Sequence, residues 1–179
     1  MGLDGIELVM AWEDQFDISI PDKDASTLRT PRIAVDCISR LVRATDTTTP
    51  GPCLSMRAFT RFRRALTTTS SCPRSAVRPG VRLASLLPAK NRTRRWWKVR
   101  DLIGVPRSCF PNLHLGVPRA TIGELSRIAV ARAAQSLRDP SAPWTRSQVR
   151  EVVRAIITDN LAIPEFSDDD DFVLDLRID

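Results

Sequence analysis

Residues 2–21 read GLDGIELVMAWEDQFDISIP, and this stretch decides how the rest of the chain is interpreted. Apolar residues recur in it at three- and four-residue spacing, which is the repeat of a helix with one apolar face. These residues are Leu3, Ile6, Val9, Met10, Trp12 and Phe16. Four acids between them are expected to face solvent: Asp4, Glu7, Glu13 and Asp14. Because Pro21 cannot continue a helix, the stretch predicts a short acidic amphipathic helix followed by an extended segment.

The charges of the chain are segregated along its length. The 179 residues carry a net charge of +6, yet residues 1–26 contain seven acids and one lysine. Residues 57–100 contain thirteen Arg and Lys and no acid, and residues 159–179 return to eight acids against one arginine. The apolar content is 42% with only 6% aromatic residues and no tyrosine, which favours small helical units over one large core.

The sequence contains no sign of export, membrane insertion or a metal centre. No apolar run approaches the roughly 20 residues that span a bilayer, and no basic leader opens the chain, so a soluble cytoplasmic protein is expected. Cys37, Cys53, Cys72 and Cys109 form no CxxC pair, which predicts neither a zinc site nor a disulfide framework.

No residue pattern indicates catalysis or a cofactor. The single histidine, His114, lies in a proline-rich segment without a nucleophile or an acid at a motif spacing. The acidic run Asp168–Asp171 lacks the glycine and the spaced final glutamate of a calcium loop. Solvation of a loop, or negative charge at the N-terminus of a following helix, accounts for it. We therefore expect no active site, no metal and no cofactor.

The remainder of the first segment supports a family resemblance. Asp22–Leu28 is a polar link, and Thr30 is the expected N-cap of a closing helix that has Pro31 in its first turn and runs to Val42. Three consecutive segments together resemble the second half of an acyl carrier protein: GLDGIELVMAWEDQF, ISIPD and TPRIAVDCI. In that family the acidic second helix begins with a serine that carries phosphopantetheine. The matching residue here is Gly2, so the attachment role does not carry over.

The missing first helix of such a carrier is found at the other end of the chain. Ser147–Asn160 (SQVREVVRAIITDN) predicts an amphipathic helix, and the terminal FVLDLRID is similar to the Phe-Val-x-Asp-Leu-Gly-x-Asp loop that precedes the carrier serine. We expect this helix to pack on the Leu3–Phe16 and Thr30–Val42 helices, either within one chain as a circular permutant or between chains by exchange. An array of repeats cut at both ends is the alternative.

The middle of the chain shows the same order of elements with weaker identity. After the linker Ala44–Ser55, a basic helix is expected over Met56–Leu66, followed by a Thr- and Ser-rich loop. Further helices are expected over Arg92–Ile103 and Thr121–Leu137, with an irregular link over Val105–Leu115. The parallel between TIGELSRIAV and TPRIAVDCI favours a degenerate carrier-like repeat, whose carrier serine falls at Asn91, over an unrelated helical insert.

These observations predict an all-α protein made of small acyl-carrier-like helical bundles, one split between the chain ends and one degenerate and basic. Residues 1–45 are the carrier-like second half, and residues 46–55 are a linker. Residues 56–138 are the basic repeat. Residues 144–179 supply the first helix and loop, which complete residues 1–45 or a neighbouring chain.

The expected function is that of a non-catalytic interaction protein that has lost the attachment serine. Protein partners are expected at the acidic helix of residues 3–16 or the basic segment of residues 57–100, and self-association by helix exchange is a further expectation. The expected partner-binding residues are Asp4, Glu7, Glu13, Asp14, Arg92, Arg94, Arg95 and Lys98.

Two alternative functions remain at this point. One is a working fatty acid or polyketide carrier that is truncated or modified at another serine. The other is a basic nucleic-acid-binding module, which Trp96 and Trp97 among arginines suggest. Adjacent helical positions point about 100° apart, however, so one tryptophan can fill the core while the other lies under arginine stems. We favour this structural interpretation, since no nucleic-acid motif accompanies the pair.

Overall fold

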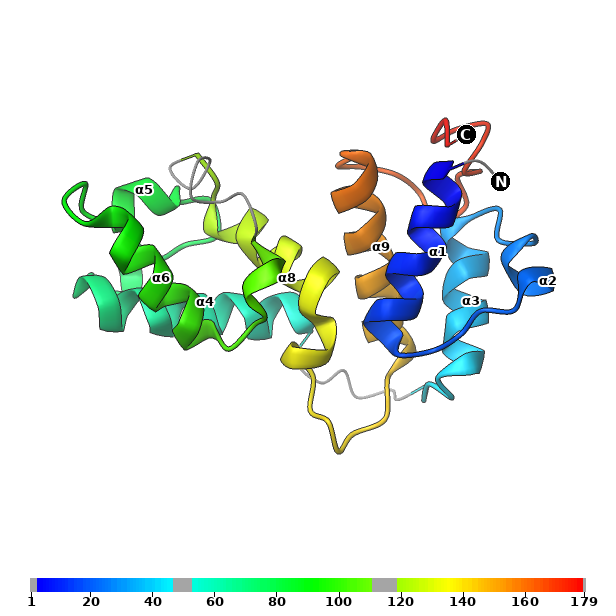
Figure 1. Ribbon diagram of the computed structural model, residues 1–179, viewed down its shortest axis with the longest axis horizontal. Coiled ribbons are helices and arrows are strands. Elements are labelled where there is room, and N and C mark those ends of the chain that lie inside the picture. The colour runs from blue at the N-terminus through cyan, green and yellow to red at the C-terminus, as the bar shows by residue number, and fades with distance from the viewer. Residues whose placement is uncertain (1–2, 47–52, 111–118, 179) are drawn as a thin grey trace. The chain divides into compact units, whose positions relative to one another are not determined.

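The computed structural model of the chain describes residues 3–46, 53–110 and 119–178 (Figure 1). These residues form helices and no β-strand, and the isolated bridges Thr45–Thr145 and Arg82–Thr121 are the extended pairings among them. The prediction of an all-α protein is confirmed. The chain divides into two compact units, which we call the split unit (residues 1–53 and 138–179) and the basic unit (residues 54–137).

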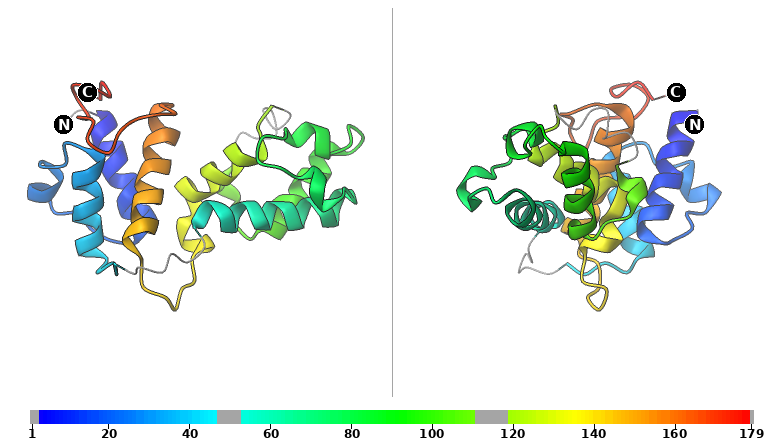
Figure 2. Two further views of the ribbon diagram at one scale, coloured as in Figure 1. Left: turned by 180° about the vertical axis from the view of Figure 1, so that it is seen from behind. Right: turned by 60° about the vertical axis from the view of Figure 1, so that its left-hand side comes forward.

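The split unit is formed by helices from both ends of the sequence. It contains α1 (Leu3–Phe16), α2 (Asp22–Ala25), α3 (Pro31–Leu41) and α9 (Arg146–Leu161). Helix α9 packs against α1 and α3 of the same chain, as two views agree (Figures 1 and 2). In this structure the helix predicted over Ser147–Asn160 therefore contacts both expected partners within one chain.

Helix α9 forms because its start is capped and one of its faces is apolar. Thr145 accepts a hydrogen bond from the backbone N of Gln148, and the Gln148 side chain accepts one from the backbone N of Thr145, which completes a capping box. The buried side chains of α9 lie along one face at helical spacing. They are Val149, Val152, Val153, Ile156 and Ile157.

The buried face of α1 differs from the predicted face. Leu8, Val9, Trp12 and Phe16 are buried, whereas Ile6 and Met10 are 47% and 58% exposed. The prediction that Ile6 and Met10 pack inward is therefore wrong. Aromatic neighbours set the orientation of the helix, since Trp12 lies 6.1 Å from Phe172 and Phe16 lies 4.9 Å from Trp144, between ring centroids.

Helix α3 begins where the sequence predicted. Thr30 accepts a hydrogen bond from the backbone N of Ile33 at 3.3 Å, and Pro31 occupies the first turn. Ile33 is exposed, and the buried face of the helix includes Ala34, Val35, Cys37 and Ile38. The expected polar link Asp22–Leu28 contains the one-turn helix α2.

The basic unit contains α4 (Leu54–Ser70), α5 (Leu83–Leu86), α6 (Arg92–Ile103) and α8 (Ile122–Leu137), with 3₁₀ turns at Arg74–Ala76 and Arg107–Cys109. Helix α4 packs against α6 and α8. Helix α4 includes Thr67–Ser70, which were expected to form a loop. The last turn is stabilised because the Thr67 hydroxyl donates to the Arg64 carbonyl and the Arg95 guanidinium donates to the Thr69 carbonyl.

An aromatic cluster forms the core of the basic unit. The ring of Phe110 lies 6.0 Å from Phe62 and 5.7 Å from Trp96, between centroids.

Helix α8 begins with a second capping box, in which the backbone N of Thr121 donates to Glu124 and the backbone N of Glu124 donates to the Thr121 hydroxyl. Among the described residues, no helix is long and apolar enough to cross a membrane.

Candidate interaction surfaces

The outer face of α1 combines acidic and apolar side chains. Asp4, Glu7 and Asp14 are exposed there, and the exposed Ile6 and Met10 lie among them. Three of the four predicted acids thus face solvent. We call Asp4, Ile6, Glu7, Met10 and Asp14 the α1 face.

The fourth predicted acid, Glu13, has a structural contact instead. Its Oε1 accepts a hydrogen bond from the backbone N of Ile20 at 2.7 Å, and its side chain is half-buried. Glu13 therefore fixes the extended exit segment against α1, and we do not include it in the α1 face.

An apolar cavity of about 410 Å³ lies beside the opposite side of α1. Helix α1, the segment that follows α2 and the C-terminal segment line it. The buried Trp12 contributes an indole N–H that has no hydrogen-bond partner among the described residues. Val173 and Leu174, which also line the cavity, are largely exposed. The N-terminal half of α1 thus has apolar surface available on two sides.

The two positions matched to the carrier serine have different outcomes. Gly2 lies outside the described residues. Asn91 immediately precedes α6 in the left-handed conformation (φ 62°, ψ 26°), and its side chain makes no capping hydrogen bond. Asn tolerates this conformation better than most residues with a side chain. The left-handed backbone of Asn91 therefore turns the chain into the start of α6.

The four predicted basic residues of α6 divide into two pairs. Arg94 and Lys98 are exposed. Arg92 donates to the carbonyls of Leu87 (3.2 Å) and Ala84 (3.3 Å), and Arg95 donates to the carbonyl of Thr69 at 2.8 Å. Arg92 and Arg95 thus bind backbone within the unit, and only Arg94 and Lys98 present their charges outward.

The tryptophan pair is divided between the core and the surface. Trp96 is buried, while Trp97 is 40% exposed and has the guanidinium carbon of Arg100 3.9 Å from its ring centroid. The expectation that one tryptophan fills the core and the other lies against an arginine is confirmed. Trp97 nevertheless leaves an indole accessible on a basic helix.

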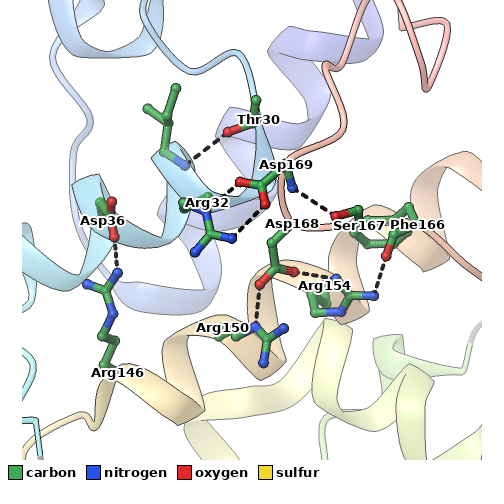
Figure 3. Close-up of polar contacts among 11 residues, drawn as sticks. Thr30, Arg32, Asp36, Arg146, Arg150, Arg154, Phe166, Ser167, Asp168 and Asp169 are labelled. Carbon is green, nitrogen blue, oxygen red and sulfur yellow. Dashed lines mark hydrogen bonds and ion pairs between the residues drawn. The ribbon is translucent and has the colours of Figure 1, made fainter.

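The acidic run near the C-terminus is held by arginines from two helices (Figure 3). Asp168 accepts hydrogen bonds from Arg150 and Arg154 of α9, and Asp169 accepts two from Arg32 of α3, at 2.5 and 2.7 Å. Asp171 accepts hydrogen bonds from the backbone N of Val173 and Leu174. These contacts fix the segment after α9 onto both helices, and they explain the run better than solvation alone.

These contacts favour the ionised carboxylates. Burial raises the pKa of Asp168, but hydrogen bonds and charge from Arg150 and Arg154 outweigh it and hold the pKa below its ordinary value. The hydrogen bond from Arg32 lowers the pKa of Asp169, and backbone N–H groups lower that of Asp171. No group of three metal-binding side chains occurs within the described ranges.

Sequence reasoning missed the arginines of this network. Arg150 and Arg154 are four residues apart on α9, which places them on one side of the helix, and that spacing was the available signal. Their partner Asp168 follows Arg150 by 18 residues, and Arg32 and Asp169 are 137 residues apart. Cys37 and Cys109 are buried, and His114 lies outside the described residues.

Comparison with known proteins adds no functional assignment. No family model matches this chain, and no solved structure matches it. The structure shows two exposed surfaces at the predicted segments, the α1 face and the outward side of α6.

Proposed function

We propose that the chain is a non-catalytic interaction protein built on acyl-carrier-like helical bundles, without the serine that carries the arm. The observation that carries this proposal is the α1 face, on which exposed Ile6 and Met10 lie among Asp4, Glu7 and Asp14. In the split unit the attachment position is occupied by Gly2, and in the basic unit by Asn91. Neither residue has a hydroxyl that could accept phosphopantetheine.

The physical character of the α1 face selects a kind of partner. Apolar side chains gain free energy when a partner removes them from water, at roughly 25 cal/mol per Å². The surrounding carboxylates would be costly against an apolar or acidic surface, and they favour a surface with arginine or lysine at its rim. The α1 face therefore fits a protein groove with an apolar floor and a basic rim, which is how the resemblance implies that carriers meet their enzymes.

The order of elements in the split unit supports the carrier-like interpretation. Starting from α9, the chain gives a helix, a segment fixed by acids, the acidic helix α1, the short α2 and the closing α3 once its two ends are read consecutively. Helix α9 also covers apolar surface of α1 and α3, which is the role expected of a carrier's first helix.

The first test is attachment of the arm. The chain, its Gly2→Ser variant and a genuine carrier protein are incubated with coenzyme A and a broad-specificity phosphopantetheinyl transferase, and intact masses are measured. We expect no added mass on the wild-type chain and added mass on Gly2→Ser and the carrier. Modification of the wild-type chain would show a working carrier and overturn the proposal.

The second test addresses docking. Binding of the chain to the same transferase is measured by calorimetry, and we expect the double variant Glu7→Lys/Asp14→Lys to bind about tenfold more weakly. Asp46→Lys/Glu165→Lys is the control, because it changes the same charge at exposed sites of the split unit outside the α1 face. No binding by the wild-type chain, or equal loss in both variants, would remove the α1 face as the docking surface.

A further inference from the structure

The basic unit carries an excess of charge that the proposed function does not use. Its residues include seventeen Arg or Lys and two acids, a net charge of +15, whereas the residues of the split unit sum to −9. Both acids of the basic unit have local partners. The Oδ1 of Asp101 lies 3.8 Å from the Nη2 of Arg107. The Glu124 carboxylate accepts a hydrogen bond from the backbone N of Thr121 in the capping box of α8. The positive excess therefore has no acidic counterpart within the unit.

Part of this excess has a structural role. Several arginines of α4 and α6 donate hydrogen bonds to backbone carbonyls at the ends of helices and turns, and this satisfies acceptors that a helix end leaves unpaired. They are Arg57, Arg61, Arg92, Arg95 and Arg100. Cations outside this group supply the outward charge.

A groove between α4 and α6 has arginine side chains along one edge. A cavity of about 490 Å³ between the two helices is lined by Arg61 and Arg64 on one side and by Leu102 on the other. Lys98 is one helical turn before Leu102 and is exposed, so it lies beside the groove. Arg94 is one turn further along the same helix and is also exposed.

The exposed indole of Trp97 lies on this helix, three residues after Arg94 and next to Lys98. The Arg100 guanidinium against the ring orients it, and 40% of the residue stays accessible. An accessible aromatic ring flanked by cations is the arrangement with which proteins hold single-stranded nucleic acids, since the ring stacks on a base while the cations meet phosphates.

We propose that Arg64, Arg94, Trp97 and Lys98, the basic face of the unit, bind single-stranded nucleic acid without sequence preference. An acidic protein segment would neutralise the cations but leave the Trp97 ring without a planar partner, whereas a nucleic acid strand supplies phosphates and bases together. A single strand is specified because bases in a duplex already stack on one another. This inference goes beyond the proposed function and does not depend on it.

Salt limits the range over which charges act on a bound strand. The Debye length at 0.15 M ionic strength is about 8 Å, so a strand on the basic face responds mainly to charges within about that distance. The residues of the basic unit sum to +15, and its exposed cations supply charge at this range.

The test uses the full-length chain and a fluorescein-labelled mixed-sequence single-stranded DNA oligonucleotide, with binding followed by anisotropy across a salt series. A duplex of the same sequence and a polyglutamate peptide are the comparison probes. We expect the single strand to bind most tightly, Trp97→Ala to weaken it about tenfold, and Trp97→Phe to restore most of the affinity. Circular dichroism confirms that each variant keeps its helices.

Charge variants separate the basic face from diffuse attraction. Arg94→Gln/Lys98→Gln should flatten the slope of log K against log salt by about 1.4, because each phosphate that is no longer neutralised removes about 0.7 from the slope. Arg119→Gln/Arg127→Gln removes the same charge from exposed positions elsewhere in the unit and should leave the slope unchanged. Absence of binding at low salt, equal binding of duplex or polyglutamate, an unchanged Trp97→Ala affinity, or equal flattening in the control pair would each overturn the proposal.

Discussion

Truncation of one buried side chain in α9 should loosen helices that lie more than a hundred residues away in sequence. Ile157 is fully buried on the face that α9 turns toward the core of the split unit. Replacing a buried isoleucine by alanine costs about 3 kcal/mol, because less apolar surface is buried and a cavity remains in the core. Since 1.4 kcal/mol is a factor of ten, the open population of the split unit should rise about 100-fold in Ile157→Ala.

Hydrogen exchange followed by mass spectrometry measures this change helix by helix. Protection should fall in α1, α3 and α9, which pack together, and stay unchanged in α4, α6 and α8 of the basic unit. Asn160→Ala, an exposed change on the same helix, is the control and should alter stability by less than about 0.5 kcal/mol. Unchanged protection of α1 and α3 in Ile157→Ala would refute the packing of α9 on these helices.

Three further variants test local contacts. Thr145→Ala removes the cap of α9 and should destabilise the split unit by about 1 kcal/mol in urea unfolding, whereas Thr145→Ser should retain most of that stability. Gly104→Ala should destabilise the basic unit by about 1 kcal/mol, because φ at this residue is +72° and alanine rarely adopts that conformation. The cost is conformational and not steric, since the nearest atom to an added Cβ, in the Arg61 side chain, is 3.9 Å away. An alanine variant as stable as the wild type would contradict this reasoning. The pKa of Asp168 is lowered in the folded chain, so its ionised carboxylate stabilises the folded state fully above the ordinary carboxyl pKa, and this stabilisation is lost as pH falls through the lowered value. Asp168→Asn should therefore lower the free energy of unfolding by about 1 kcal/mol at neutral pH. The urea midpoint of this variant should also depend less on pH in the acidic range than that of the wild type.

Local signals in the sequence were sufficient to place several helices. Helix α6 spans Arg92–Ile103 as predicted, and α3 begins after Thr30 with Pro31 in its first turn. Both predictions depend on residues within a few positions of the helix end. Such signals act on the chain before any tertiary contact forms.

The orientation of helix faces could not be predicted as well. In α1 the apolar residues exceed what one buried face can hold, and either Ile6 with Met10 or Leu8 can accompany Val9 inward. Packing of Trp12 and Phe16 against Phe172 and Trp144 determines which face of α1 is buried, and Phe172 and Trp144 are more than a hundred residues away in sequence. The α1 face, with its exposed apolar residues, was therefore visible only in the structure.

The ion pairs of the split unit show the same limit. A run of four acids and the three arginines of α9 were both apparent in the sequence, yet many pairings were compatible with them. In the structure, Asp168 pairs with Arg150 of α9 and Asp169 pairs with Arg32 of α3 (Figure 3). Pairings at such separations depend on the fold, and charge patterns alone do not determine them.

The division of the split unit between both ends of the sequence has a consequence for synthesis on the ribosome. Helices α1 and α3 emerge early, but α9, which covers their apolar faces, is translated only after the whole basic unit. The basic unit is continuous in sequence and can complete its own core before α9 is available to pack on α1 and α3. Throughout that interval the newly made chain exposes apolar surface on α1 and α3, so these two helices need protection from aggregation until α9 has been made.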